Sequence, residues 1–222
     1  MISDQTSYVP VTNIKIPLLP SDQTTISILD LLGKWLPVFR EQYLYVPSSH
    51  LEDRISKELS AFLQSNSNSF VFQFNDKKGV DFQILIKPYV LWAKPIFMIE
   101  AKRLPASNDS KEYVTGKTGG IERFKREQEG FILDRNHCAM VAYIQKNTFD
   151  YWFNRVNRWL AELIDDNENY ADFNWENSDK LVAITSGTSD IARYISSHSR
   201  KTLSKLTIDH FWLDMRVKDI PL

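Results

Sequence analysis

The chain has 222 residues, and its 27 basic side chains (Lys and Arg) nearly balance 28 acidic ones (Asp and Glu), for a formal net charge of −1. This balance excludes a protein that holds nucleic acid through an overall positive charge. Hydrophobic residues make up 43% of the chain and aromatic residues 13%, which is typical of a folded globular protein and not of a disordered one. A chain of this length favours one domain with its own hydrophobic core.

The cysteine content and the apolar runs indicate where the protein resides. Cys138 is the only cysteine, so the chain forms no internal disulfide bond, which fits the reducing cytoplasm. The apolar runs are far shorter than the roughly 20 residues that a membrane-spanning helix needs. Residues 1–20 lack the basic and apolar regions of a signal peptide. We therefore expect a cytoplasmic protein that makes no contact with a membrane.

Residues 1–47 are expected to form an N-terminal arm and helices that pack on the body of the protein. Prolines within residues 1–24 favour an extended segment over a helix. Apolar residues are closely spaced between residues 26 and 45, which indicates helix. Because proline interrupts helical hydrogen bonding unless it lies in the first turn, Pro37 predicts two short helices in this region.

A domain with a C-terminal extension is expected over residues 48–222, and it begins with a helix. Apolar residues at helical spacing predict this helix over residues 51–64. Ser49 and Glu52 have the spacing of a capping box, in which each side chain satisfies a free backbone N–H group of the first helical turn.

The pattern changes from helix to strand after residue 69. Two strand patterns, at residues 70–74 and 80–86, flank the turn-forming residues 75–79 and predict a β-hairpin. Residues 96–102 are apolar until the end of the run, as expected of a central strand that is covered on both faces.

The rest of the chain alternates between predicted helices and strands. This order indicates a three-layer α/β sandwich with a central mixed β-sheet flanked by helices. An acidic segment over residues 165–179 and a basic stretch over residues 193–205 lie among these elements. The predicted elements are a helix over residues 121–133, a strand over 138–144, a helix over 151–164, and strands over 181–185 and 206–215.

Charged residues end the apolar run of the predicted central strand. Glu100 and Lys102 are two residues apart, so a strand projects both side chains to the same face. Asp81 lies at the start of the preceding strand pattern, and an antiparallel pairing would bring it to Glu100. Charged groups at the end of a buried strand are costly without partners, and a metal ion and a phosphate are partners of the required charge.

The residue types at this point favour one metal chemistry over others. Two carboxylates with room for water and a substrate phosphate suit Mg²⁺ better than Zn²⁺, and Mn²⁺ is expected to substitute for it. The four histidines are widely separated and lack the spacing of a zinc site. Cys138 lies in a buried-strand pattern and is expected to pack in the core. Trp152 and Trp159 share one helix face, which favours packing over base stacking.

These residues resemble the PD-(D/E)XK nuclease superfamily, whose fold is also called restriction-endonuclease-like. Val80-Asp81 stands in place of the Pro-Asp pair of that superfamily, and Glu100-Ala101-Lys102 matches its (D/E)-x-K motif in full. The missing proline is a departure from the pattern. The resemblance covers residues 51–144, where the predicted order of helix, three strands, helix and strand is that of the superfamily.

The resemblance implies a metal site and a catalytic lysine. Asp81 and Glu100 would bind Mg²⁺, with the backbone carbonyl of Ala101 as a further ligand. Lys102 would orient or help deprotonate the attacking water and stabilise negative charge on the phosphorus.

Two helices are expected to add side chains to this site. A glutamate from the helix before the first strand often joins sites of this superfamily, and Glu52 is the first choice here and Glu58 the second. Helix capping is the alternative role for Glu52. Basic residues of the helix after the central strand would contact substrate phosphates, or would form a solvated charged face with i,i+4 ion pairs. These basic residues are Arg123, Lys125 and Arg126.

The resemblance therefore predicts a Mg²⁺-dependent endonuclease that hydrolyses phosphodiester bonds, in DNA in preference to RNA, in bacterial restriction, antiphage defence or repair. The alternative is a nuclease-like fold without catalysis, which binds nucleic acid or a protein as a subunit. Because the chain is nearly neutral and its basic residues are only locally concentrated, we expect a homo-oligomer or a partner subunit to help deliver the substrate.

Overall fold

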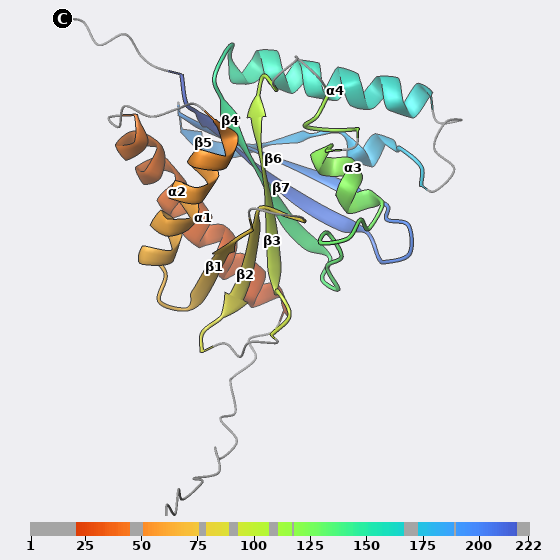
Figure 1. Cartoon of the computed structure of the whole chain (residues 1–222). Helices are drawn as coiled ribbons and strands as arrows, with labels where there is room; N and C mark the ends of the chain where they lie inside the picture. Colours follow the sequence, from red (N-terminus) through yellow and green to blue (C-terminus); the bar gives the residue numbers. More distant parts are fainter. Residues whose placement is uncertain are drawn as a thin grey trace, which may run out of the picture.

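A seven-stranded β-sheet lies at the centre of the computed structural model, over the residues that it describes, which are 21–44, 51–75, 79–88, 93–106, 111–116, 118–166, 173–188 and 190–216 (Figure 1). The helices are α1 (Ser21–Tyr43), α2 (Glu52–Ser65), α3 (Gly120–Lys125), α4 (Phe149–Asp165) and the 3₁₀ turn η2 (Asn177–Asp179). The strands are β1 (Phe70–Phe74), β2 (Phe82–Ile86), β3 (Phe97–Leu104), β4 (His137–Ile144), β5 (Val182–Thr188), β6 (Ile191–His198) and β7 (Leu206–Asp214).

The sheet lies between two groups of helices. α1 and α2 share one hydrophobic core with the sheet, and α3 and α4 share a second core on its opposite face (Figure 1). Along β3, Ile99 and Ala101 belong to the first core, whereas Met98 and Leu104 belong to the second. Side chains that alternate between two buried faces explain why this strand is apolar in sequence. The prediction of an α/β fold with a mixed sheet and flanking helices is confirmed.

Parallel strands at the centre of the sheet join two antiparallel groups, in the order β1-β2-β3-β4-β7-β6-β5. β1, β2 and β3 are antiparallel neighbours, so the predicted hairpin is confirmed. β3 is parallel to β4 and β4 is parallel to β7, while β6 is antiparallel to both of its neighbours. The chain passes from β3 to β4 through α3, because two parallel strands need a crossover connection.

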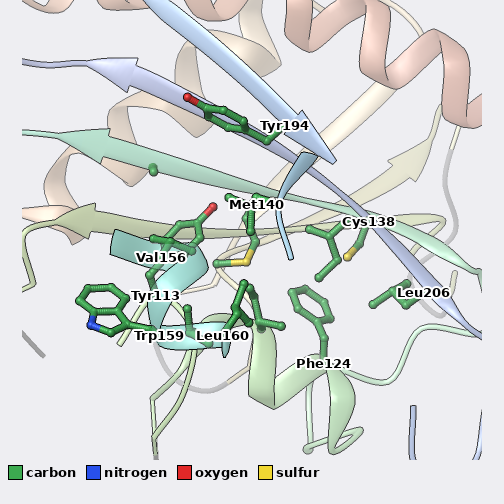
Figure 2. Packing of buried hydrophobic residues seen from close by; sticks show 14 of the residues in the cluster. Tyr113, Phe124, Cys138, Met140, Val156, Trp159, Leu160, Tyr194 and Leu206 are labelled. Atoms are coloured by element: carbon green, nitrogen blue, oxygen red, sulfur yellow. The ribbon is translucent and has the colours of Figure 1, made fainter. Parts of the chain in front are cut away.

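The core beneath α3 and α4 contains several of the side chains that the sequence made conspicuous. Figure 2 shows Cys138 and Met140 of β4 in this core together with Phe124 of α3. Cys138 is fully buried, so its predicted place in the core is confirmed. Trp152 and Trp159 of α4 are buried in the same cluster, which confirms packing as their role.

α1 is one continuous helix, and the prediction of two short helices is wrong. Pro37 lies inside it and removes one backbone hydrogen bond. Leu36 and Phe39, on either side of the proline, are both buried. Burial of this apolar stripe continues across the proline and offsets the lost bond. The helix also begins within the segment predicted to be extended, of which residues 1–20 lie outside the described residues.

α2 begins without the predicted capping box. Its N-cap residue is Leu51, which makes no side-chain capping hydrogen bond, and Ser49 lies outside the described residues. Glu52 is therefore the first helical residue, whereas a capping box needs the glutamate at the third position of the helix. Its carboxylate instead contacts β3, as described below.

α3 ends at Lys125, so the predicted helix over residues 121–133 is too long. Glu127 has a positive φ of 53°, which lies outside the helical region. The chain is held in this turn because the Glu127 carboxylate accepts hydrogen bonds from the backbone N–H groups of Thr202 and Leu203. Phe131 is buried, but it reaches the core from a loop.

The C-terminal part contains a strand, β6, that is absent from the sequence-based prediction. Charged and small residues interrupt its apolar pattern, and Arg193 made the region resemble a basic loop. The acidic segment predicted over residues 165–179 lies partly outside the described residues, and Asp179 at its end is buried. Among the helices that are described, none is long and apolar enough to cross a membrane.

Candidate functional site

The candidate site lies where β3 extends beyond its neighbour β2. β2 pairs with β3 only from Phe97 to Ile99, whereas β4 pairs with β3 as far as Leu104. Within the described residues, the edge of β3 that faces away from β4 therefore has no neighbouring strand after Ile99. Backbone N–H and C=O groups on such an edge need other partners. Two acidic side chains accept hydrogen bonds from the N–H groups of this edge.

Asp81 occupies the first position along this edge. Phe82 pairs with Ile99, so the antiparallel register puts Asp81 opposite Glu100. Oδ2 of Asp81 accepts a hydrogen bond of 2.7 Å from the backbone N–H of Ala101. Because the N–H and C=O groups of one strand residue point to the same side, the carbonyl of Ala101 faces this edge as well.

Glu52 occupies the next position and links α2 to β3. Its Oε2 atom accepts a hydrogen bond of 2.7 Å from the backbone N–H of Arg103, and its Oε1 atom lies 3.3 Å from Nζ of Lys102. Glu58 pairs with Arg54 on α2 and has no ion pair with Lys102 among the described residues. The structure therefore brings Glu52, and not Glu58, to the other predicted residues.

Glu100 is the most deeply buried carboxylate of the site, with 1% of its side chain exposed. Its Oε1 atom lies 2.9 Å from Nζ of Lys102 and accepts a hydrogen bond of 3.1 Å from Nη1 of Arg123. Its Oε2 atom is buried and has no hydrogen-bond donor. A buried carboxylate oxygen without a partner is costly, and a cation bound there would remove the cost.

Arg123 joins α3 to three other segments. Besides Glu100, it contacts the carbonyl oxygen of Gly79, to which Nη2 donates a hydrogen bond of 3.2 Å, and its guanidinium group lies 3.9 Å from the ring centre of Phe131. The segments that carry Gly79 and Phe131 also touch directly. A Cβ atom added to Gly130 would lie 2.4 Å from Cα of Gly79, so this contact between two backbones requires glycine at position 130.

These side chains line a cleft of about 550 Å³. All four predicted catalytic side chains, Glu52, Asp81, Glu100 and Lys102, face this space together with Arg123. A cavity of this size admits a nucleotide-sized group. The cleft is thus lined by five acidic and four basic side chains, because Asp53, Glu112, Arg54 and Lys57 face it as well.

Burial sets the protonation of this cluster. It raises the pKa of Asp81 well above its usual range, and the nearby Glu100 carboxylate raises the pKa of Asp81 further. Burial also raises the pKa of Glu100 and of Glu52, although Lys102 opposes both shifts. For Lys102, burial alone would lower the pKa, but the charge of Glu100 and of the other two carboxylates outweighs burial and raises it. Lys102 therefore remains protonated, while the carboxylates gain from a further positive charge.

The donor atoms of the site fit a hard divalent cation. Among the described residues, no group of three or more His, Cys, Asp or Glu side chains is placed to hold a metal ion. A smaller set is present, namely the carboxylates of Asp81 and Glu100 and the carbonyl of Ala101. Oxygen donors of this kind suit Mg²⁺ or Mn²⁺, which retain several bound waters. Burial and the neighbouring Glu100 both raise the pKa of Asp81, so a bound cation would relieve the cost of holding these two carboxylates together.

The structure separates the three basic residues that were predicted to contact substrate phosphates. Arg123 lines the cleft. Lys125 follows Arg123 by two residues, and side chains two apart on a helix project to nearly opposite sides. Its side chain therefore points away from the cleft, where it is fully buried and pairs with Asp179 at 2.7 Å. Arg126 pairs with Glu122 at 2.6 Å, which is the i,i+4 pairing weighed as the alternative. Lys125 and Arg126 are therefore not brought to the site.

Two other basic residues line the cleft and were missed in the sequence. Arg54 and Lys57 lie in the first turns of α2 and are exposed. Their spacing of three residues puts them on neighbouring positions of one helix face. The signal for them in the sequence is their proximity to Glu52 on the same predicted helix.

Comparisons with known proteins assign no family and no function to the chain. No protein-family model, no curated protein and no solved structure matches the chain. The functional conclusion rests on the residues and contacts described above.

Proposed function

We propose that this protein is a divalent-metal-dependent nuclease of the PD-(D/E)XK type, which hydrolyses phosphodiester bonds and acts on DNA in preference to RNA. One observation carries the proposal. Asp81, Glu100 and Lys102, which match the superfamily motif, meet in one cleft at the open edge of β3. The order of strands supports a restriction-endonuclease-like fold, because an antiparallel β1-β2-β3 meander is followed by the crossover helix α3 and the parallel strand β4.

Four side chains of the cleft have a task in this reaction. Asp81, Glu100 and the carbonyl of Ala101 would hold Mg²⁺, which when bound supplies Lewis-acid activation of water and of the phosphate. Lys102 carries a fixed positive charge beside Glu100 and is suited to orient the attacking water and to stabilise negative charge on the phosphate. Glu52 holds Lys102 in place through its Oε1 atom, 3.3 Å from Nζ.

The exposed basic residues of the cleft are suited to bind the substrate backbone. Arg54 and Lys57 of α2 each present a positive charge to the cleft, and Arg123 of α3 adds a third. Phosphate contacts of this kind position nucleic acid without reading its sequence. With a net charge of only −1 over the chain, a homo-oligomer or a partner subunit would help to recruit DNA, as in bacterial restriction, antiphage defence or repair.

The proposal is tested by incubating the purified full-length protein with Mg²⁺ or Mn²⁺ and with plasmid DNA, linear DNA or RNA. We expect cleavage that requires the metal and that is lost in Asp81→Asn, Glu100→Gln and Lys102→Met. Asp134→Asn is the matched control, because this carboxylate is exposed and lies outside the cleft. Cleavage that persists in all three cleft variants, or that is lost equally in the control, contradicts the proposal.

A catalytically inactive nuclease-like subunit, which binds nucleic acid or a protein, is the second candidate. The observation that favours it is that the carboxylates of the cleft are already paired with other groups of the protein. Asp81 and Glu52 already accept backbone N–H groups of β3, and Glu100 is paired with Lys102 and Arg123. Metal titration separates the two candidates. A rise in melting temperature with Mn²⁺ that disappears in Asp81→Asn supports the nuclease, and an unchanged melting temperature in both proteins supports the subunit.

A further inference from the structure

A series of buried hydrogen bonds lies beside α3, on the side away from the cleft. Nζ of Lys125 donates to the two carboxylate oxygens of Asp179 at 2.7 and 3.0 Å. Asp179 also bonds to Nδ1 of His198, whose Nε2 atom lies 2.6 Å from Oγ of Ser196. The same hydroxyl lies 2.7 Å from Nε2 of His210. All five side chains are buried, so water does not replace these bonds.

The series returns to α3 at the opposite end of the helix. Nδ1 of His210 lies 2.7 Å from the hydroxyl of Tyr113, which also accepts a hydrogen bond of 2.9 Å from Nε1 of Trp212. The carbonyl of Tyr113 in turn accepts a hydrogen bond from the backbone N–H of Ile121 in the first turn of α3. Tyr113 is seen in the core of Figure 2. We call the series the buried ring, and its members are Lys125, Asp179, His198, Ser196, His210 and Tyr113.

One arrangement of hydrogens satisfies every member of the buried ring. Tyr113 donates to His210, His210 donates to Ser196, and Ser196 donates to His198, which donates to Asp179. Both histidines are neutral in this arrangement, in keeping with burial, which lowers the pKa of His198 and lowers that of His210 to about 3. A buried polar network in which each group has a partner rigidifies the elements that it joins.

α3 depends on such support. The helix has six residues, and a helix of this length is unstable without tertiary contacts. Lys125 reaches the buried ring on one side of α3, while Arg123 contacts Glu100 and Gly79 on the other side. The position of Arg123 in the cleft is therefore linked to contacts that lie outside the cleft.

We propose that the buried ring holds α3 in register with β3, so that Ser196 and Asp179 act as positioning residues for Arg123. In this role the buried ring serves the proposed nuclease, and the part of the inference that concerns cleavage rests on that function. The position of α3 itself is independent of cleavage. Two measurements therefore separate the two claims.

The first measurement uses the full-length protein without substrate. Ser196→Ala breaks the buried ring by removing one hydroxyl, and Ser60→Ala is the matched control, because Ser60 is as buried and bonds the carbonyl of Phe72 at 3.2 Å on the other face of the sheet. We expect Ser196→Ala to raise hydrogen exchange at the amides of α3 by about tenfold or more relative to the amides of β4, and Ser60→Ala to leave α3 unchanged. Unchanged exchange at α3 in Ser196→Ala overturns the inference, whether or not the protein cleaves DNA.

The second measurement applies if the parent protein cleaves DNA. Ser196→Ala is expected to lower kcat by about five- to tenfold with little change in KM, at a temperature at which all variants are fully folded. In an Arg123→Ala background, Ser196→Ala should lower kcat no further, because its effect passes through Arg123. Equal losses with and without Arg123 overturn the inference. Asp179→Asn provides a second break in the buried ring, and it should show the same dependence on Arg123.

Discussion

Asp81 and Ala101 are joined by a hydrogen bond of 2.7 Å between a carboxylate oxygen and a backbone N–H group. This bond closes the edge of β3 at the point where its pairing with β2 ends. Asp81 therefore serves the fold as well as the proposed metal site. The two tasks are separable, because an amide side chain can accept the same bond without carrying a charge.

Asp81→Asn is expected to leave the protein at least as stable as the parent and to remove cleavage. The substitution keeps an acceptor for Ala101 and takes away a buried charge whose pKa is raised by burial. Asp81→Ala should lower the free energy of unfolding by about 1–3 kcal/mol, because the N–H group loses its partner. Both variants should lose cleavage by at least about 100-fold. Urea unfolding and a plasmid cleavage assay measure the two effects, and parental cleavage by Asp81→Asn contradicts the metal site.

Glu52→Gln and Glu58→Gln distinguish the two glutamates of α2. Glu52 holds Lys102 and the backbone of Arg103, whereas Glu58 pairs with Arg54 near the surface. We expect Glu52→Gln to reduce the cleavage rate by about tenfold, because Lys102 loses one of its two carboxylate partners, and Glu58→Gln to stay within about twofold of the parent. Steady-state cleavage under identical conditions tests both, and equal rates for the two variants would remove Glu52 from the site.

Arg54→Gln together with Lys57→Gln should weaken the binding of duplex DNA in a salt-dependent manner. If each residue contacts one phosphate, the slope of log K against log salt falls by about two for the double variant. Fluorescence anisotropy with Ca²⁺ in place of Mg²⁺ reports binding, because Ca²⁺ also takes oxygen ligands. Lys94→Gln is the control, since Lys94 is an exposed residue outside the cleft. A double variant that keeps the parental slope shows that these residues do not contact phosphates.

Acid should destabilise the protein through the buried histidines. Burial lowers the pKa of His210 to about 3, and it also lowers the pKa of His198. The unfolded chain binds these protons near pH 6.5, so stability is present above pH 6.5 and is lost as the pH falls toward 3, by up to about 1.4 kcal/mol per pH unit for each histidine. Asp209 and Asp179, whose pKa values are lowered, add to the loss in acid, whereas Asp81 opposes it.

The contribution of His210 is isolated by comparing the parent with His210→Gln. The carboxylates titrate in both proteins, so their effects cancel in the difference between the two unfolding free energies. We expect the parent to lose stability between pH 7 and pH 5 more steeply than the variant, as measured by urea unfolding. Parallel losses over this range contradict the assignment of a neutral, buried His210.

The sequence predicted the centre of the site because its determinants are local. The common face of Glu100 and Lys102 follows from strand geometry, and the antiparallel pairing expected of neighbouring strands puts Asp81 opposite Glu100. The contacts of Arg54 and Lys57 with the cleft depend on how α2 lies against β3, which no local pattern specifies. The same reason accounts for Lys125, whose partner Asp179 is distant in sequence and belongs to a segment that composition marked only as acidic.

Errors in the predicted elements have a similar cause. Pro37 should end a helix on local grounds, but burial on both sides of it sustains α1. Nothing near Glu127 in the sequence predicts that α3 ends there, because the partner that holds its carboxylate is the backbone N–H of Thr202, which is distant in sequence. Tertiary contacts therefore decide these boundaries, and they are not visible in the spacing of residues along the chain.

The contact between Gly79 and Gly130 has a consequence for how the cleft can change. One glycine belongs to the turn before Asp81 and the other to the loop that carries Phe131, and their backbones touch without any side chain between them. Gly79 lines the cleft, so main-chain atoms alone fix the position of this part of its wall against the neighbouring loop. Trimming side chains at this contact therefore leaves the wall where it is. Moving the wall requires one of the two loops to change its length.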